Sequence, residues 1–125
     1  MNHIYPTLSY RDAGAAMRFL KDAFGFEEHA VHRGDNGKIA HAELRFGDGM
    51  IMFGDAGEGE ADVRTGVAAT YVTVDDPDAH HERAKAGGAE IVMELRDTDY
   101  GSRDYAATDP EGNRWFFGTY DPLAA

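Results

Sequence analysis

Apolar and polar residues follow a helical period in one part of this chain and alternate in several others. An amphipathic helix is predicted between Asp12, a good N-cap residue, and Gly25, which ends the pattern. Its apolar positions fall at i, i+3, i+4, i+7 and i+8: Ala16, Phe19, Leu20, Ala23 and Phe24. A shorter helix is predicted over Ala79 to Ala86, after Asp76 as N-cap and Pro77 as first helical residue.

Short runs of β-branched and aromatic residues, separated by turn residues, predict the strands. These runs are 4–10, 26–33, 38–46, 50–53, 67–74, 89–95, 103–108 and 114–119. The run 38–46 alternates most cleanly, as expected for a strand with one buried face. Asp109-Pro110-Glu111-Gly112 joins the last two runs and has the Pro and Gly positions of a tight reverse turn. The chain is therefore expected to close with a β-hairpin.

The same order of elements occurs twice. Four pairs of cap and turn residues keep one separation to within a residue: Asp12–Asp76 (64), Gly25–Gly88 (63), Gly37–Gly101 (64) and Gly49–Gly112 (63). The sequence thus predicts an α+β fold in one domain, residues 1–125, built from two βαβββ repeats. The repeats span about 3–54 and about 66–120, and a Gly-rich acidic linker of about 55–65 joins them.

Composition and charge narrow the classes of function. The chain has 125 residues and no cysteine, which excludes disulfides, a thiolate nucleophile and a Cys-based zinc site. Its formal charge of −11 makes nucleic acid an unfavourable partner. The sequence has no membrane-length apolar run and no secretory leader pattern, so we expect a cytoplasmic protein. The excess of acidic residues either keeps the protein soluble or attracts a cationic ligand.

The two repeats and the pattern GSRDY…DPEGNRWFFGTY resemble the vicinal oxygen chelate (VOC) superfamily. That superfamily includes glyoxalase I, bleomycin-resistance proteins, fosfomycin-resistance enzymes and extradiol dioxygenases. The chain is most similar to its single-chain glyoxalase/bleomycin-resistance-like members. The resemblance implies sheets that curl around a cavity, often completed by a second subunit, and hence a homodimer.

Metal-using VOC members take a His, Gln or Glu from the first and last strand of each repeat. Counting from the capping aspartates and turn glycines places these positions at Tyr5, Phe53, Ala69 and Phe116. None of these side chains is a competent ligand for a divalent cation. The resemblance therefore indicates a protein without metal or other cofactor, which binds a small molecule and sequesters an antibiotic or metabolite.

The expected cavity combines aromatic side chains with a few polar ones, as small-molecule sites do. The predicted ligand-binding residues are Tyr5, Thr7, Phe53, Tyr71, Arg103, Arg114 and Phe116. The aromatic rings would stack on the ligand, and the two arginines would bind a carboxylate or phosphate. The alternative is that the rings belong to the core and the arginines form salt bridges.

His41 and Glu43 are two residues apart and so share one face of a predicted strand. They are the candidate catalytic pair: a general base with its carboxylate, or half of a divalent metal site at a non-standard position. The corresponding function is a VOC-fold lyase, isomerase or dioxygenase. The alternative is a polar strand face with a charge pair to Arg45. On the second helix, His80 and His81 are expected on a solvated face.

Overall fold

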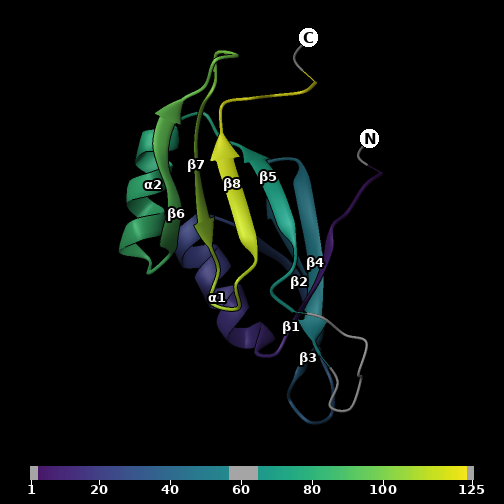
Figure 1. Ribbon diagram of the computed structural model, residues 1–125. Coiled ribbons are helices and arrows are strands. Elements are labelled where there is room, and N and C mark those ends of the chain that lie inside the picture. The colour runs from purple at the N-terminus through teal and green to yellow at the C-terminus, as the bar shows by residue number, and fades with distance from the viewer. Residues whose placement is uncertain (1–2, 57–64, 124–125) are drawn as a thin grey trace.

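A computed structural model describes residues 3–56 and 65–123, and these form the predicted order of elements (Figure 1). The elements are β1 (Thr7–Tyr10), α1 (Ala13–Phe24), β2 (Glu27–Arg33), β3 (Ile39–Phe46), β4 (Gly49–Asp55), β5 (Ala69–Thr73), α2 (Pro77–Ala86), β6 (Glu90–Asp97), β7 (Arg103–Thr108) and β8 (Arg114–Gly118). Asp55 belongs to β4 and not to the predicted linker, most of which lies outside the described residues.

Each repeat forms one four-stranded mixed sheet with the same topology. The strand orders are β1-β4-β3-β2 and β5-β8-β7-β6. The first strand of each repeat pairs in parallel with the last one, and the other pairs are antiparallel. The two sheets are separate and neither closes into a barrel. This arrangement confirms the predicted α+β fold of two βαβββ repeats.

Both helices begin at the predicted caps. The carboxylates of Asp12 and Asp76 accept hydrogen bonds at 3.0 Å from the backbone N–H groups of Ala15 and Ala79. Gly25 ends α1 in the left-handed conformation, with φ of 83°. Neither helix in the described part of the chain is long and apolar enough to span a membrane.

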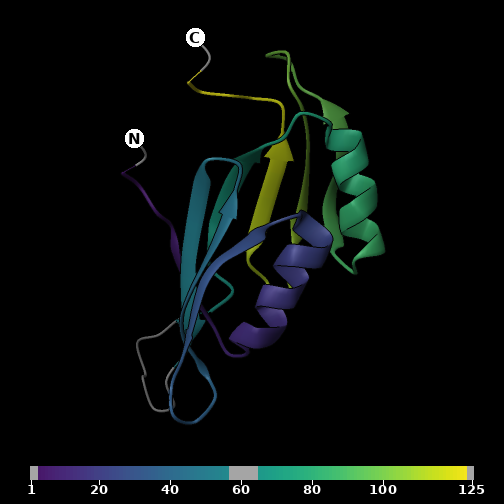
Figure 2. The ribbon, with the colours of Figure 1, turned by 180° about the vertical axis from the view of Figure 1, so that it is seen from behind.

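The two helices pack against each other and cover one side of both sheets (Figures 1 and 2). The residues that face them from the strands are buried: Leu8, Tyr10, Ala42, Leu44, Ile51 and Phe53 in the first sheet, and Tyr105, Ala107, Trp115 and Phe117 in the second. Phe24 of α1 joins the two sets, because its ring lies 4.7 Å from Phe117 and 5.8 Å from Trp115. The two repeats therefore share one core within one chain. The opposite side of each sheet, called here the open face, carries no helix formed by residues 3–56 or 65–123.

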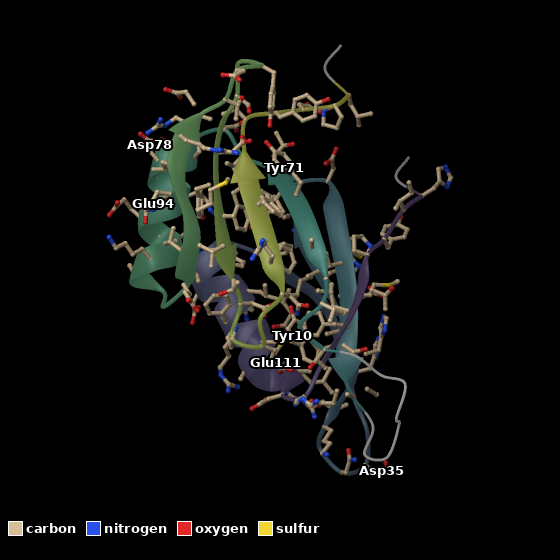
Figure 3. The ribbon with its side chains drawn as sticks, viewed as in Figure 1. Tyr10, Asp35, Tyr71, Asp78, Glu94 and Glu111 are labelled. Atoms are coloured by element: carbon tan, nitrogen blue, oxygen red, sulfur yellow. The ribbon has the colours of Figure 1, made fainter. Side chains whose placement is uncertain are left out.

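The closing hairpin adds a second link between the repeats. The buried carboxylate of Asp109 accepts hydrogen bonds from the Tyr10 hydroxyl at 2.6 Å and the Trp115 indole N–H at 3.1 Å. The carboxylate of Glu111 accepts from the backbone N–H groups of Arg11 at 2.6 Å and Asp12 at 2.9 Å. Figure 3 shows Tyr10 and Glu111 together where the hairpin meets the start of α1. The hairpin thus fixes the second repeat to the first helix.

The sheet registers correct the predicted equivalence of Phe53 and Phe116. In the first sheet Leu8, four residues before the capping Asp12, pairs with Phe53. In the second sheet its counterpart Val72, four residues before Asp76, pairs with Phe117. The positions of Phe53 and Phe117 are therefore equivalent, and Phe116, which pairs with Tyr71, lies on the opposite face. The count from the turn glycines is one residue off because Gly49 is the first residue of β4, whereas Gly112 lies in the turn before β8.

The solvated face predicted for His80 and His81 is wrong. His81 is 5% exposed and His80 is half-buried between α2, β7 and the end of α1. The His80 ring donates from Nε2 to the carbonyl oxygen of Phe24 at 2.8 Å and accepts at Nδ1 from the Tyr105 hydroxyl at 2.5 Å. Because a carbonyl oxygen only accepts, the ring carries a proton on Nε2. Burial lowers the pKa of His80 and so favours the neutral ring, in which Nδ1 is the acceptor.

Candidate ligand-binding groove

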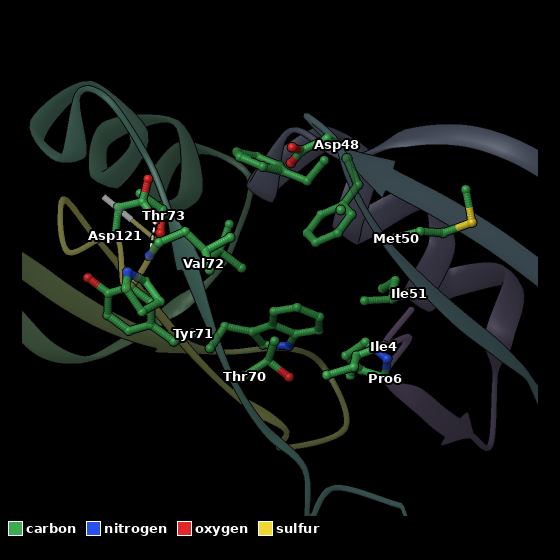
Figure 4. A pocket seen from close by; sticks show the side chains of 16 residues that line it. Ile4, Pro6, Asp48, Met50, Ile51, Thr70, Tyr71, Val72, Thr73 and Asp121 are labelled. Atoms are coloured by element: carbon green, nitrogen blue, oxygen red, sulfur yellow. Dashed lines mark hydrogen bonds between the residues drawn. The ribbon is translucent and has the colours of Figure 1, made fainter. Parts of the chain in front are cut away.

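A groove of about 370 Å³ lies between the two sheets, at the strands where they approach each other. We call it the intersheet groove. Its walls are the end of β3 and the start of β4 on one side and β5 on the other, closed by the segment before β1 and the segment after β8 (Figure 4). In Figure 4, Tyr71, Thr73 and Asp121 stand across an open space from Ile4, Pro6 and Ile51. The volume suits a small organic molecule.

The lining of the intersheet groove is aromatic, aliphatic and acidic. Four aromatic residues contribute to its walls: Phe26, Phe46, Tyr71 and Trp115. The only charged residues among the described lining are Asp48 and Asp121, and no Lys, Arg or His is present there. Such a site offers ring faces for stacking and carboxylates as acceptors. Its chemistry favours an aromatic or aliphatic ligand that carries positive charge.

Trp115 is held in the floor of the intersheet groove by the network that joins the repeats. The residue is fully buried, and its ring packs edge-on against Phe26 at 5.5 Å between centroids. Its indole N–H is bonded to Asp109, so the ring orientation is fixed from the side away from the groove. The same hairpin that anchors α1 therefore sets the shape of the groove floor.

Of the predicted ligand-binding residues, Tyr71 lines the intersheet groove. Its hydroxyl donates to Asp104 Oδ1 at 3.1 Å and accepts from the backbone N–H of Tyr120 at 3.0 Å. Burial raises the pKa of Tyr71 to about 12, and the negative charge of Asp104 contributes in the same direction. Tyr71 is therefore neutral at physiological pH and is fixed by two partners.

The structure places the other predicted ligand-binding residues outside the lining. Phe53 is 2% exposed and packs edge-on against Tyr10 in the core. The remaining ones are Tyr5 and Thr7 near the first sheet edge, Arg103 and Arg114 on the outside, and Phe116 on the open face beside Tyr71. Arg103 forms ion pairs with Asp78 at 2.7 Å and Asp97 at 3.2 Å. Whether any of them binds a ligand stays a prediction.

His41 and Glu43 meet on the open face of the first sheet and do not line the intersheet groove. The His41 Nε2 atom is 2.9 Å from Glu43 Oε2, and His29 Nε2 is 3.8 Å from Glu43 Oε1. The hydrogen bond from His41 lowers the pKa of Glu43. Within residues 3–56 and 65–123, no three His, Asp or Glu side chains gather so as to hold a metal ion.

Sequence reasoning missed most of the groove lining. The prediction placed Tyr71 in the cavity, whereas its neighbours Thr70 and Val72, which point to the other face of β5, also line it. A groove between two sheets receives side chains from both faces of an edge strand, so parity along β5 does not identify its lining. Asp48 and the segment 121–123 lie in a turn and a tail, for which the sequence carries no periodic signal.

The fold and the groove together define a class: paired βαβββ repeats with a small-molecule-sized groove between their sheets. Residues 1–117 match the family described as the Glyoxalase/Bleomycin resistance protein/Dioxygenase superfamily, and the chain belongs to this family. A protein of Mycobacterium bovis described as uncharacterized is 33% identical over 121 aligned residues, which cover 90% of this chain and 80% of that protein. The predicted family membership is confirmed.

Solved structures show the same architecture. TioX from Micromonospora sp. ML1 is 33% identical, with a TM-score of 0.79, and the match covers 99% of this chain and all of TioX. TnmS3, an antibiotic binding protein from Streptomyces sp. CB03234, is 20% identical, with a TM-score of 0.75 and coverage of 94% of each chain. At that identity the likeness to TnmS3 concerns the fold alone.

Proposed function

We propose that this protein binds a small molecule in the intersheet groove without a metal ion and thereby sequesters an antibiotic or another metabolite. The observation that carries the proposal is the groove itself: about 370 Å³, walled by four aromatic residues and fixed by a buried hydrogen-bond network. The metal-independent form is supported by the residues at the positions where the family resemblance implies metal ligands, Tyr5, Phe53, Ala69 and Phe116, because none of them is a competent ligand. The corrected sheet register replaces Phe116 by Phe117 as the counterpart of Phe53, which adds no ligand either. A related fold in TnmS3, described as antibiotic binding, is consistent with sequestration.

The ligand is proposed to be cationic. The chain carries a net charge of −11, which raises the local concentration of cations near its surface. Inside the groove, the charged residues Asp48 and Asp121 are both acidic. These carboxylates repel an anionic ligand and accept only ordinary hydrogen bonds from a neutral one, whereas an ammonium or guanidinium group gains stronger, charge-assisted hydrogen bonds.

The protein is also proposed to form a homodimer. No helix of the described residues covers the open face of either sheet, and Val92 on β6 of the second sheet is an exposed large hydrophobic residue. A second copy of the chain is the partner that the family resemblance implies for such faces. Sedimentation equilibrium tests this proposal: a mass of twice 13.7 kDa supports it, and a mass of 13.7 kDa at all concentrations contradicts it.

An enzymatic function is the second candidate, because His41 and Glu43 are hydrogen-bonded at 2.9 Å as a general base and its carboxylate partner would be. Sequestration uses the intersheet groove and no metal ion, whereas the enzyme would use His41 and Glu43 on the open face of the first sheet, alone or with a bound divalent metal. Titration with Ni²⁺ or Zn²⁺ separates them: tight stoichiometric binding that is lost in His41→Ala would favour the enzyme and contradict metal-independent sequestration.

A thermal-shift screen with cationic antibiotics and metabolites, in the presence of EDTA, tests the leading proposal. A ligand at about 100 times its Kd stabilises the native state by about 2.7 kcal/mol, which raises the melting temperature by several degrees. Thr70→Trp fills the groove and should abolish the shift, while Glu90→Trp adds the same ring at an exposed position on β6, outside the lining, and should keep it. Equal shifts in both variants would exclude the groove as the site.

A further inference from the structure

A buried carboxylate without a cationic partner lies behind Tyr71, one of the residues that line the intersheet groove. Asp104 on β7 is 5% exposed, and it forms no ion pair with any residue in the described part of the chain. Arg96 is its cross-strand neighbour but does not pair with it, and the adjacent Arg103 is bonded to Asp78 and Asp97 instead. A buried negative charge that lacks a countercharge stabilises any cation that approaches it.

Three tyrosines surround this carboxylate. The hydroxyls of Tyr71 and Tyr100 donate to Asp104 Oδ1 at 3.1 Å and to Oδ2 at 3.4 Å. The Tyr120 ring packs edge-to-face against Tyr71 at 6.3 Å and against Tyr100 at 6.0 Å. Because all three side chains are 39–69% exposed, their rings are accessible to a ligand. We call Asp104 and these three residues the tyrosine cluster.

The backbone around the tyrosine cluster is built to hold this arrangement. Gly118 is the cross-strand partner of Asp104, and a Cβ atom there would collide with the carboxylate of Asp104 and come within 2.6 Å of the Tyr71 hydroxyl. The Thr73 hydroxyl donates to the carbonyl oxygen of Tyr120 at 2.7 Å, which fixes the start of the chain segment after β8. The cluster is therefore ordered before a ligand binds, which reduces the entropic cost of binding.

We propose that the tyrosine cluster is the subsite for the positive charge of the ligand, a quaternary or protonated organic ammonium group. The ammonium group packs against the faces of the tyrosine rings and is stabilised by the charge of Asp104. Tyr71 belongs both to this cluster and to the groove lining, so the apolar remainder of the same molecule extends along the groove. This inference rests on the proposed function, because the groove holds the rest of the ligand.

Choline and its neutral isostere 3,3-dimethylbutan-1-ol test the subsite, because they match in shape and differ in charge. Each is titrated at constant ionic strength into the full chain, and the ring signals of isotope-labelled tyrosine are followed by NMR. Choline should shift the signals of Tyr71, Tyr100 and Tyr120, and the neutral alcohol should not. Equal shifts with both probes, or no shift with choline, would overturn the subsite.

Two variants locate the charge effect. Asp104→Asn keeps a hydrogen-bond acceptor and removes the charge, and it should weaken choline binding about tenfold. Tyr120→Leu should weaken it about fivefold, since a cation–π contact contributes roughly 1 kcal/mol. Glu90→Gln is the control: it removes the charge of an exposed carboxylate on β6 of the same sheet, outside the cluster, and should leave choline binding unchanged. Unchanged affinity in Asp104→Asn, with the native chemical-shift pattern retained, contradicts the proposal.

The failure of this inference can be told apart from failure of the proposed function. Trp115 is the single tryptophan of the chain and lies in the groove floor, outside the tyrosine cluster. One outcome would refute the cation subsite alone. In that outcome a screening hit shifts the NMR signal of the Trp115 indole, but choline does not shift the tyrosine signals. In the opposite outcome the screen finds no ligand that shifts the Trp115 signal, but choline binds at the tyrosines. That result would refute sequestration in the groove and leave the cation subsite standing.

Discussion

Removal of one hydroxyl group tests how the two repeats are held together. Asp109 is 5% exposed and accepts five hydrogen bonds, from Tyr10, Glu111, Trp115 and both nitrogens of Asn113. The bond from Tyr10 is the shortest at 2.6 Å and is the member of this network that crosses from the first repeat to the second. Tyr10→Phe keeps the ring, including its edge-on contact with Phe53 at 5.2 Å, and deletes this bond alone.

The expected loss of stability follows from the negative charge of the acceptor, the Asp109 carboxylate. A hydrogen bond to a charged group contributes about 1.5–3 kcal/mol, and the variant leaves a buried carboxylate with one donor fewer. We therefore expect the free energy of unfolding to fall by about 2 kcal/mol. With a urea m-value of roughly 2 kcal/mol/M, the unfolding midpoint moves down by about 1 M. Circular dichroism during urea titration measures both quantities.

Tyr120→Phe is the matched control for this experiment. Its hydroxyl forms no hydrogen bond with the described residues, and its side chain is 49% exposed. The control should change the unfolding free energy by less than about 0.5 kcal/mol. If Tyr10→Phe lowers the free energy of unfolding no more than Tyr120→Phe does, the hydrogen bond between Tyr10 and Asp109 does not stabilise the contact between the repeats.

Further predictions concern glycine positions and pH. Gly118→Ala should destabilise the fold by about 2 kcal/mol, because the added methyl group collides with Asp104. Gly14→Ala in α1 should stabilise it by about 0.5–1 kcal/mol, because the added methyl group makes only ordinary contacts, at 3.6 Å, with the side chains of Arg18 and Asp12. Burial lowers the pKa of His80 below its ordinary value of 6.5. The unfolded chain therefore takes up this proton first, so stability is complete above about pH 6.5 and falls as the pH drops towards the lower folded pKa. Urea titrations of His80→Gln across this range should show a weaker pH dependence than those of the unchanged chain.

The elements of this fold could be predicted because their signals are local. The caps Asp12 and Asp76, the left-handed Gly25 and the turn at Asp109 each act within a few residues, and each lies where the sequence places it. The repeat was visible for the same reason. Burial of His80 could not be predicted, since α2 has a weak apolar pattern and its environment is supplied by α1 and β7.

The candidate site was harder to predict because it depends on how two sheets approach each other. Because the turns before β4 and β8 differ by one residue, Phe53 faces the core while Phe116, counted as its equivalent, lies on the open face. Each such one-residue shift exchanges buried and open positions. The sequence around Asp104 does not indicate that its carboxylate is buried. Its surroundings are Tyr71, Tyr100 and Gly118, which has no side chain, and these residues come from three different segments.

The central claim is that the intersheet groove binds a small molecule, and NMR of a screening hit tests it most directly. The hit is titrated in EDTA into uniformly ¹⁵N-labelled protein, and the shifts of the Trp115 indole and of the Thr70, Val72 and Ile51 amides are compared with those of His41 and Glu43. The account predicts saturable shifts at the four groove residues and none at His41 and Glu43. Shifts confined to His41 and Glu43, on the open face of the first sheet, would contradict it.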